Sequence, residues 1–360
     1  MAHDRLPKDR FRHFGNFLKR FDQHRSSYRI QAMDDYDFSI ANTRFVASYG
    51  LIANCDIHAA VLQSSAVNLT YLAQINARLT AFPDIGRPIS IYVCTDALPE
   101  FAKSVLPNID RPFTLVSGDS DMPVNATALG DAIALITNHP NLKNWFAQNI
   151  DCEHAKLHAL PIGLDLHSKW IEPTIWGGGM ILPALQELEL RTILLNSLPW
   201  MQREPMAYCD WVMALERGDR QECRDRIDPA ICVYPHESIA RSQAWARQAQ
   251  YAFVVSPAGA GIDCHRTWEA LALGCVPIVK RSGITSLFEH LPVIVVNDWS
   301  EVSKALLEAK HQEMQHQTFD FSKLLMTYWK NQINGDDAKN TEAEILPRMT
   351  LNQFRQMLTA

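Results

Sequence analysis

The sequence predicts an α/β protein built from two doubly wound parallel sheets that face a common cleft. Short apolar runs recur along the chain and end in clusters of polar residues, and stretches with helical periodicity lie between them. Runs that are apolar throughout are typical of strands buried on both faces, and their alternation with helices is the βαβ pattern of a parallel sheet. The alternation starts again after Trp176-Gly177-Gly178-Gly179, which is the best candidate for a hinge.

In the first half, each expected strand precedes a polar cluster. The expected strands are residues 89–94, 113–116, 132–136 and 157–162, with a helix over residues 98–106. The second half repeats this pattern, with strands expected at residues 192–196, 230–234, 251–256, 276–280 and 293–296. Its helices are expected at residues 182–190, 204–215, 237–249, 264–273 and 301–308, with two more after residue 319.

Composition excludes several classes of protein. The 360 residues are 47% hydrophobic and 21% charged, which provides a substantial core and excludes general disorder. The formal net charge of -6 argues against a protein that binds nucleic acid through bulk phosphate attraction. The sequence contains no run of 18 apolar residues, so a membrane-spanning helix is not expected. Eight scattered cysteines and the absence of a signal-like apolar stretch near residue 1 lead us to expect reduced thiols and a cytoplasmic protein.

The first 30 residues stand apart because they carry eight basic and three acidic side chains, a balance of +5 (8 minus 3). Phe11, Phe14, Leu18 and Phe21 recur at helical spacing on one face. Such a helix could lie on an anionic membrane surface, giving a cytoplasmic protein that is peripheral at a membrane. The favoured interpretation is a terminal helix that packs its Phe residues on the body of the protein.

Ligands of parallel sheets bind beyond the carboxyl ends of the strands, so the polar clusters indicate one wall of a site. The residues expected there are Asp96, Asp119, Asp121, Asn138, His139 and Asp165. The opposite wall is predicted by the segment from Val254 to Val279, in which a strand ends in a loop containing Gly259 and Gly261.

Asp263 is expected to cap the helix that follows this loop. Glycines allow backbone N–H groups to approach an anion, and the helix N-terminus favours negative charge. Arg266, one turn into the helix, can bind a phosphate or carboxylate, and Glu269 can accept hydrogen bonds from ribose hydroxyls. The plainer alternative is a tight turn followed by an i,i+3 ion pair.

Other motifs are weaker. A dinucleotide fingerprint is disfavoured because Cys264 stands at the third glycine position and Lys280-Arg281 ends the next strand. Asp119-Ser120-Asp121 matches the Asp-x-Asp signature of metal-dependent, single-domain (GT-A) glycosyltransferases, although such tripeptides are common. No Cys-x-x-Cys, nucleophile elbow, Walker loop or His-Glu-x-x-His occurs.

The segment from Ser256-Pro257 through Gly259, Gly261, Asp263, Arg266 and Glu269-Ala270-Leu271 to Gly274-Cys275-Val276-Pro277 resembles the C-terminal signature of exostosin-like glycosyltransferases. Its continuation, Leu291-Pro292-Val293-Ile294-Val295 into Asp298-Trp299, is similar as well. The first half resembles relatives of that group more loosely, through Thr95-Asp96, Ser117–Asp121 and Leu160–Asp165.

The resemblance implies the two-domain GT-B architecture, with the nucleotide-sugar bound mainly by the C-terminal domain. The expected divisions are a basic segment 1–36, a Rossmann-like acceptor domain 37–178, a Rossmann-like nucleotide-sugar domain 179–335, and a C-terminal helix in 336–360 that can cross back to the acceptor domain. The family's donor-contacting positions carry over to Gly259, Gly261, Arg266 and Glu269. The chain lacks the membrane anchor and second transferase domain of animal exostosins, so a bacterial or viral role in surface-polysaccharide biosynthesis is more natural than heparan-type polymerisation.

The expected activity is therefore transfer of a sugar from a nucleotide diphosphate, such as a UDP-sugar, to a glycan or other hydroxyl acceptor. A metal-independent enzyme must stabilise the leaving diphosphate with helix N-termini and basic residues. Arg266 is the first candidate, followed by Arg203 and Lys280, with Ser256 and Asp263 also on the donor side. If the enzyme inverts, Asp119 or Asp121, or less readily Asp96, deprotonates the acceptor.

The acceptor side is expected to include Asp96, His139 and Asp165. No cofactor, metal or nucleic acid is expected. The rival functions are a GT-A-like, metal-dependent transferase, a nucleotide-sugar epimerase and a non-catalytic sugar-binding protein.

Overall fold

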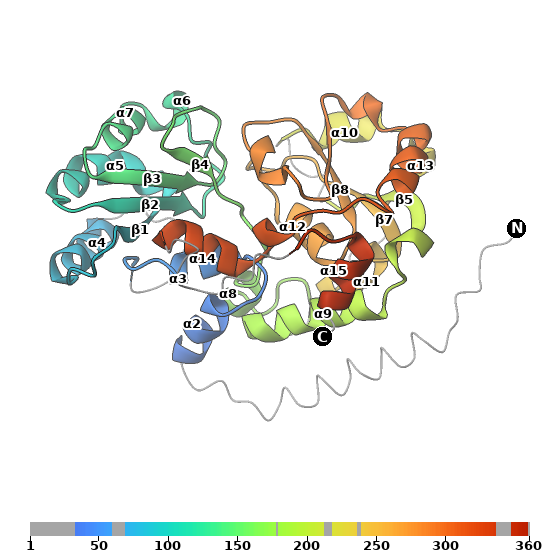
Figure 1. Cartoon of the computed structure of the whole chain (residues 1–360), viewed down its shortest axis with the longest axis horizontal. Coiled ribbons are helices and arrows are strands. Elements are labelled where there is room, and N and C mark those ends of the chain that lie inside the picture. Colours follow the sequence, from blue (N-terminus) through green and yellow to red (C-terminus); the bar gives the residue numbers. More distant parts are fainter. Residues whose placement is uncertain are drawn as a thin grey trace, which may run out of the picture. The chain divides into compact units, whose positions relative to one another are not determined.

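A computed structural model describes residues 33–59, 69–177, 179–211, 218–235, 239–335 and 347–358. In this part of the chain the protein is α/β, with one four-stranded and one five-stranded parallel sheet (Figure 1). Residues 39–360 form a single compact unit. No helix among the described residues is long and apolar enough to cross a membrane. The amphipathic helix expected in the basic N-terminal segment lies outside the described residues.

The first sheet has the strand order β1-β2-β3-β4, so each strand pairs with its neighbour in sequence. Its strands are β1 (Ile89–Cys94), β2 (Phe113–Gly118), β3 (Leu142–Ala147) and β4 (Leu157–Ala159). All residues of β1 and β2 are buried, as expected for apolar strands covered on both faces. The helices of this half are α2 (Met33–Ala41), α3 (Ser48–Ala53), α4 (Leu69–Ala81), α5 (Leu98–Ser104), α6 (Ala126–Leu129), α7 (Ala132–Thr137) and α8 (Ser168–Ile171).

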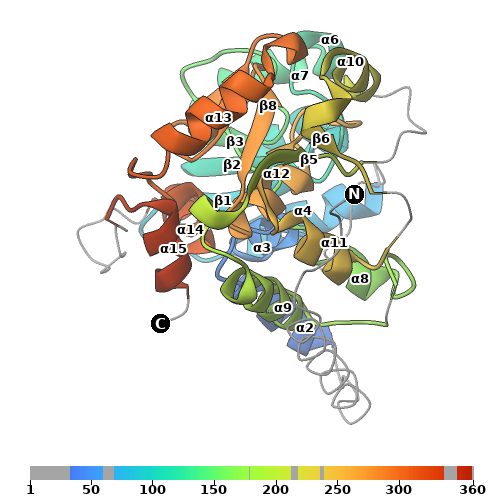
Figure 2. The same ribbon diagram turned by 90° about the vertical axis from the view of Figure 1, so that its right-hand side faces the viewer.

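The second sheet has the order β6-β5-β7-β8-β9, and all of its pairs are parallel. Its strands are β5 (Glu204–Tyr208), β6 (Cys232–Val233), β7 (Tyr251–Val255), β8 (Val276–Lys280) and β9 (Ile294–Val296). Helices α12, α11 and α13 pack on β8, β7 and β5 respectively (Figure 2). The helices of this half are α9 (Pro183–Asn196), α10 (Arg220–Arg226), α11 (Arg241–Gln248), α12 (His265–Ala272), α13 (Lys304–Glu313), α14 (Met326–Asn334) and α15 (Leu351–Met357).

Three predicted elements have the wrong type. Residues 132–136 form helix α7 instead of a strand, because the residues facing the protein, Ala132 and Ile136, are four positions apart while Leu135 is exposed. Residues 192–196 continue α9, where Leu190, Ile193 and Leu194 form one buried face. Residues 204–208 form strand β5, although a helix was predicted over 204–215. Strand β3 is not predicted by the sequence pattern.

The return to the first sheet is made by α14 and not by the last helix. The Ser90 hydroxyl on β1 donates to Asn334 Oδ1 at the end of α14 (2.8 Å). Helix α15, by contrast, lies against the end of α9, where Arg355 donates to the carbonyl groups of Leu194 (3.2 Å) and Leu195 (2.6 Å). The described part of residues 336–360 therefore packs on the second half of the chain, which corrects the expected crossing.

Candidate functional site

Two adjoining cavities lie at the carboxyl ends of the strands. The first, which we term the arginine cavity, has a volume of about 540 Å³ and is lined by the glycine loop, Arg220, Arg266 and Glu269 among others. The second, the aspartate cavity, has a volume of about 480 Å³ and is lined by Ser48, Asp96, Asp119, Ser120, Asp121, Met122, Ile162, His167 and His265. Asp121, Ile162 and His265 line both cavities, so the two share a border.

Asp119 is the most unusual group in the aspartate cavity. It directly follows β2 with a positive φ of 53°, a conformation that Asp tolerates better than most residues, and its N–H donates to Gln148 Oε1 (2.9 Å). Its Oδ2 atom is buried and has no hydrogen-bond partner among the described residues. Burial raises the pKa of Asp119 to about 7. A side-chain hydrogen bond with Tyr49 opposes this rise, and the nearby carboxylates of Asp96, Asp165 and Asp121 add to it. This carboxyl group therefore titrates near neutral pH.

The other predicted strand-end aspartates have different environments. Asp96 follows β1 and accepts a hydrogen bond from the Ser120 hydroxyl. Asp121 is exposed at the border of the two cavities. Both strand-end positions are as predicted, but Asp119 is the one that combines burial with an unpartnered oxygen.

Asp165 is buried, and its carboxylate bonds to neighbouring protein groups. It accepts from the Ser168 N–H (2.9 Å) at the start of α8 and lies 3.3 Å from His167 Nδ1. Burial alone would raise the pKa of Asp165, but the adjacent His167, His265 and the Ser168 N–H lower it to about 2. Burial lowers the pKa of His167 to about 4, and its ring stacks on Tyr49 with centroids 3.9 Å apart. Asp165 and His167 are therefore held by protein contacts and have a structural role beside the cavity.

His265 is the first residue of α12 and borders both cavities, although the sequence pattern does not predict a role for it. Its Nδ1 lies 2.7 Å from the Gly163 carbonyl oxygen. Because a carbonyl only accepts, Nδ1 carries a proton and donates to it. The sequence feature that could have identified His265 is its position at the start of a predicted helix, directly after a loop that follows a strand.

Asp263 does not cap α12, which corrects the prediction. The N-cap residue is Cys264, and no side chain caps the helix. The Asp263 carboxylate is buried and accepts from the N–H of Ile162 (2.7 Å) and from Trp268 Nε1 (2.9 Å). Burial raises its pKa to about 6. Asp263 thus links the loop after β4 to α12 through hydrogen bonds. The N–H groups in the first turn of α12 have no side-chain cap.

The glycines of the loop make room for two side chains. A Cβ on Gly259 would lie 2.6 Å from Arg220 Nη2, and one on Gly261 would lie 2.9 Å from Asn149 Nδ2. Asn149 is itself held, because it donates to the Ser120 carbonyl (2.9 Å) and accepts from the Asp263 N–H (2.9 Å). Close packing therefore accounts for both glycines.

Arg266 and Arg220, together with Arg241, place guanidinium groups at the arginine cavity, whose lining also includes the carboxyl groups of Asp121, Asp165, Asp210, Asp263 and Glu269. Arg266 is half-buried; its Nε donates to the Asp210 carbonyl (2.8 Å), and its guanidinium lies 5.7 Å from the Trp211 ring centroid. Burial lowers the pKa of Arg220, and the charge of Arg266 lowers it further. Two guanidinium groups that repel each other at one cavity favour an anionic ligand. Arg220 was missed because only the fold brings α10 to this loop.

Glu269 also lines the arginine cavity, as the sequence predicted. Burial raises its pKa, against the attraction of Arg241. Arg241 lies between the rings of Trp176 and Trp245, with centroid distances of 4.9 and 4.6 Å, and donates to the Asp165 carbonyl (2.6 Å). A carboxylate in this position can accept hydrogen bonds from ligand hydroxyl groups.

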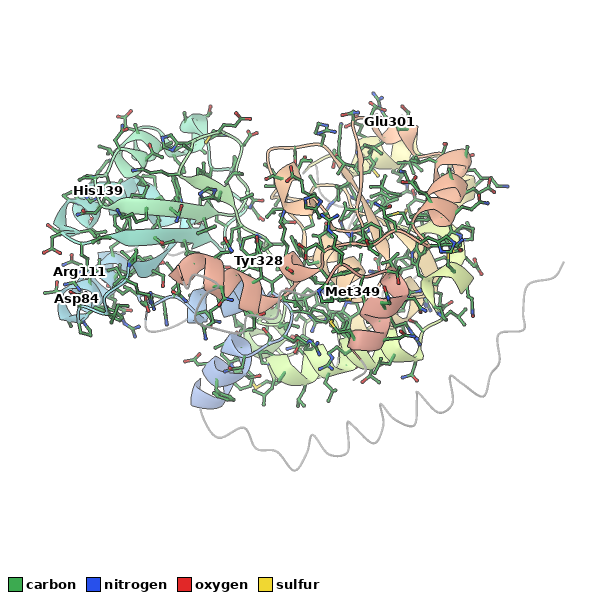
Figure 3. The ribbon with its side chains drawn as sticks, viewed as in Figure 1. Asp84, Arg111, His139, Glu301, Tyr328 and Met349 are labelled. Carbon is green, nitrogen blue, oxygen red and sulfur yellow. The ribbon has the colours of Figure 1, made fainter. Side chains whose placement is uncertain are left out.

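Five predicted site residues line neither of the two cavities. Arg203 is buried and donates to Ser197 Oγ (2.9 Å) and the Leu198 carbonyl (3.1 Å). Lys280 pairs with Glu222 (2.9 Å) beside a third cavity of about 280 Å³, which Ser256 also lines and which shares Asp263 with the arginine cavity. His139 precedes β3 and lies at the amino ends of the strands (Figure 3). His139 and Asn138 were predicted at the carboxyl end of a strand because residues 132–136, which form α7, were predicted to be that strand.

No set of three or more His, Cys, Asp or Glu side chains in the described ranges is arranged to hold a metal ion. Comparison with known proteins does not identify a family. No family model matches the sequence, and a search of curated proteins gives no significant match. The resemblance to exostosin-like transferases thus stays a prediction, and function must be inferred from the two cavities.

Proposed function

We propose that this protein is a glycosyltransferase that moves a sugar from a nucleotide diphosphate to a hydroxyl acceptor, with inversion and without a metal ion. One observation carries the proposal. A cavity with three arginines and an uncapped helix N-terminus shares a border with a cavity that holds a carboxyl group titrating near neutrality. The first suits a diphosphate, and the second suits a general base.

The arginine cavity supplies what the leaving group needs. Negative charge builds on the diphosphate as the bond to the anomeric carbon breaks, and Arg266, Arg220 and the N–H groups of α12 can stabilise it. Its volume of about 540 Å³ is within the range of roughly 300–1,000 Å³ found for ligand sites. Glu269 is available to bind ribose hydroxyls.

Asp119 supplies the base. The acceptor oxygen attacks the anomeric carbon, its proton passes to the Asp119 carboxylate, and the diphosphate leaves with the electrons of the broken bond. A carboxyl group with a pKa of about 7 takes up a proton more readily than an ordinary aspartate at neutral pH. The oxygen without a partner can accept the hydroxyl proton without giving up a structural hydrogen bond.

The decisive test measures nucleotide binding by calorimetry. The wild type is expected to bind UDP or GDP, and Arg266→Ala to lose about 10- to 100-fold in affinity, because it removes a charge-assisted contact. Lys304→Ala is the matched control, since it removes one exposed positive charge on α13. Failure of the wild type to bind either diphosphate, or equal affinity in Arg266→Ala, would contradict the proposal.

The rival functions give different results in companion assays. An epimerase changes the donor when no acceptor is present. A sugar receptor binds sugar and ignores the nucleotide. A metal-dependent transferase using Asp119 and Asp121 loses activity in excess chelator, whereas we expect full activity there. The anomeric configuration of the product, measured by NMR, is expected to be inverted relative to the donor.

A further inference from the structure

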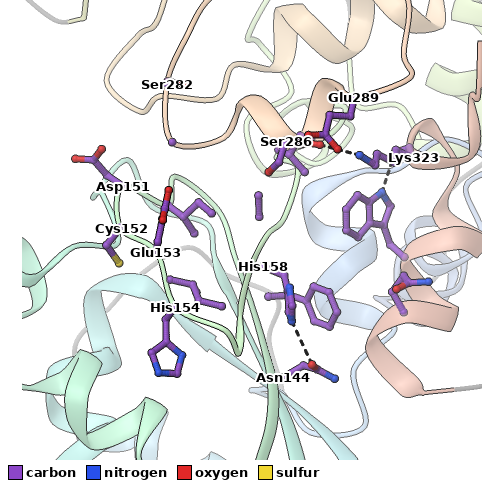
Figure 4. A pocket seen from close by; sticks show the side chains of 18 of the residues that line it. Asn144, Asp151, Cys152, Glu153, His154, His158, Ser282, Ser286, Glu289 and Lys323 are labelled. Carbon is purple, nitrogen blue, oxygen red and sulfur yellow. Dashed lines mark hydrogen bonds between the residues drawn. The ribbon is translucent and has the colours of Figure 1, made fainter.

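We propose that a further cavity holds the outer sugars of an uncharged oligosaccharide acceptor. This cavity, termed the β4 cavity, has a volume of about 930 Å³ and is separate from the two described above. It lies between the edge strand β4, the loop after β3 and helix α14, and residues lining it include Asn144, Asp151, Glu153, His158, Glu289 and Tyr328 (Figure 4). The inference rests on the proposed transferase function, because it names the substrate class of that enzyme.

The charges of the β4 cavity disfavour anions. Asp151, Glu153 and Glu289 contribute three carboxylates, whereas Lys323 contributes one ammonium group. That ammonium group is already engaged, because Lys323 Nζ donates to the Ser286 carbonyl (2.7 Å), as Figure 4 shows. Like charges would repel a nucleotide, a phospholipid headgroup or an acidic glycan from this lining.

The remaining groups favour sugar hydroxyls over a simple cation. Asn144, Gln332 and Ser286 offer neutral side chains that donate as well as accept. Partial burial lowers the pKa of His158, which keeps its imidazole neutral at pH 7, and its Nε2 lies 3.2 Å from Asn144 Oδ1. The half-buried ring of Tyr328 adds an apolar face. Mixed donors and acceptors around an aromatic ring match a polyhydroxylated ligand, whereas a polyamine needs acceptors alone.

The β4 cavity lies close to the proposed reaction site along the chain, because one short loop links their surroundings. Asn149 donates to the Ser120 carbonyl at the aspartate cavity, and Asp151 and Glu153 follow it in the β4 cavity. Four residues span at most about 14 Å, so the two places lie within the length of a short oligosaccharide. The loop before η5 (Thr285–Phe288) closes this edge, because a Cβ on Gly283 would lie 2.2 Å from the Ile150 carbonyl oxygen.

Binding of neutral oligosaccharides tests the inference directly, by glycan array followed by saturation-transfer NMR. Affinity is expected to rise from a monosaccharide to a tetrasaccharide of the same series. Ser286→Trp, which fills the cavity, and Tyr328→Ala, which removes the ring, are each expected to lower tetrasaccharide affinity about tenfold. Tyr328→Phe keeps the ring and serves as the matched control, and circular dichroism checks that each variant is folded.

The outcomes separate this inference from the proposed function. UDP affinity is expected to be equal in wild type, Ser286→Trp and Tyr328→Ala, whereas Arg266→Ala is expected to lose UDP and keep the tetrasaccharide. Affinity that does not rise with chain length, unchanged binding in both cavity variants, or binding of spermine or acidic glycans alone would overturn the inference and leave the transferase standing. Tetrasaccharide binding that Ser286→Trp abolishes, in a protein that binds no nucleotide, would retain the β4 cavity and reject the transferase.

Discussion

At the scale of the single residue, the buried carboxyl group of Asp119 is expected to favour catalysis and to lower the stability of the fold. We expect Asp119→Asn to lower kcat by about 10²- to 10⁴-fold, the usual contribution of a general base. In the wild type, kcat is expected to fall as pH drops below about 7, because the carboxyl group becomes protonated. The measurement is a pH–rate profile with donor and acceptor saturating. An Asn variant with wild-type kcat would exclude Asp119 as the base.

The same variant should be more stable than the wild type. The folded state holds a proton on Asp119 that the unfolded chain has lost between pH 3.8 and about 7, so this group's contribution to stability falls as pH rises through that window. Removing the charge is expected to increase the free energy of unfolding by up to about 4 kcal/mol at pH 8 and by little at pH 4. Urea unfolding at both pH values measures this. A gain of the same size at both would contradict the assigned pKa.

At the scale of the element, Asp263 joins the loop after β4 to α12. Its carboxylate accepts from Ile162 N–H and Trp268 Nε1; Trp268 is buried with it, and Ile162 is half-buried. Asp263→Asn replaces one acceptor oxygen with an NH₂ group that faces a donor, and we expect a loss of about 1–3 kcal/mol in unfolding free energy. Asp121→Asn, at an exposed position, is the matched control. An unchanged free energy of unfolding in Asp263→Asn would mean that the hydrogen bonds of Asp263 do not stabilise the fold.

The elements also show what the sequence could and could not predict. β7, α12 and β8 were predicted nearly to the residue, because uninterrupted apolar strands flank a glycine loop. β3 was missed because Lys143 and Asn144 interrupt its apolar pattern. The strand-end positions of Asp96 and Asp119 follow from local sequence, since they need only a strand and its end. His265 and Arg220 acquire their roles from packing between distant segments, which periodicity does not report.

Across the whole molecule, residues 39–360 form one compact unit although they contain two sheets. Polar contacts cross between the two halves of the chain: Asp263 accepts from the Ile162 N–H, His265 Nδ1 contacts the Gly163 carbonyl, and Arg241 donates to the Asp165 carbonyl. Because these groups are largely buried, separating the halves would leave them without partners and cost free energy. The two sheets are therefore expected to unfold together.

Hydrogen exchange on peptides from β1–β2 and from β7–β8 tests this coupling. We expect the slowest amides of both sheets to share one opening free energy. UDP at 100 times its Kd should raise both by about 2.7 kcal/mol, because ligand binding stabilises the whole cooperative unit. Arg266→Ala, which weakens UDP binding, should reduce the increase in both sheets equally. Protection confined to β7–β8 would show instead that the two sheets open independently, and that the contacts at Asp263, His265 and Arg241 do not couple them.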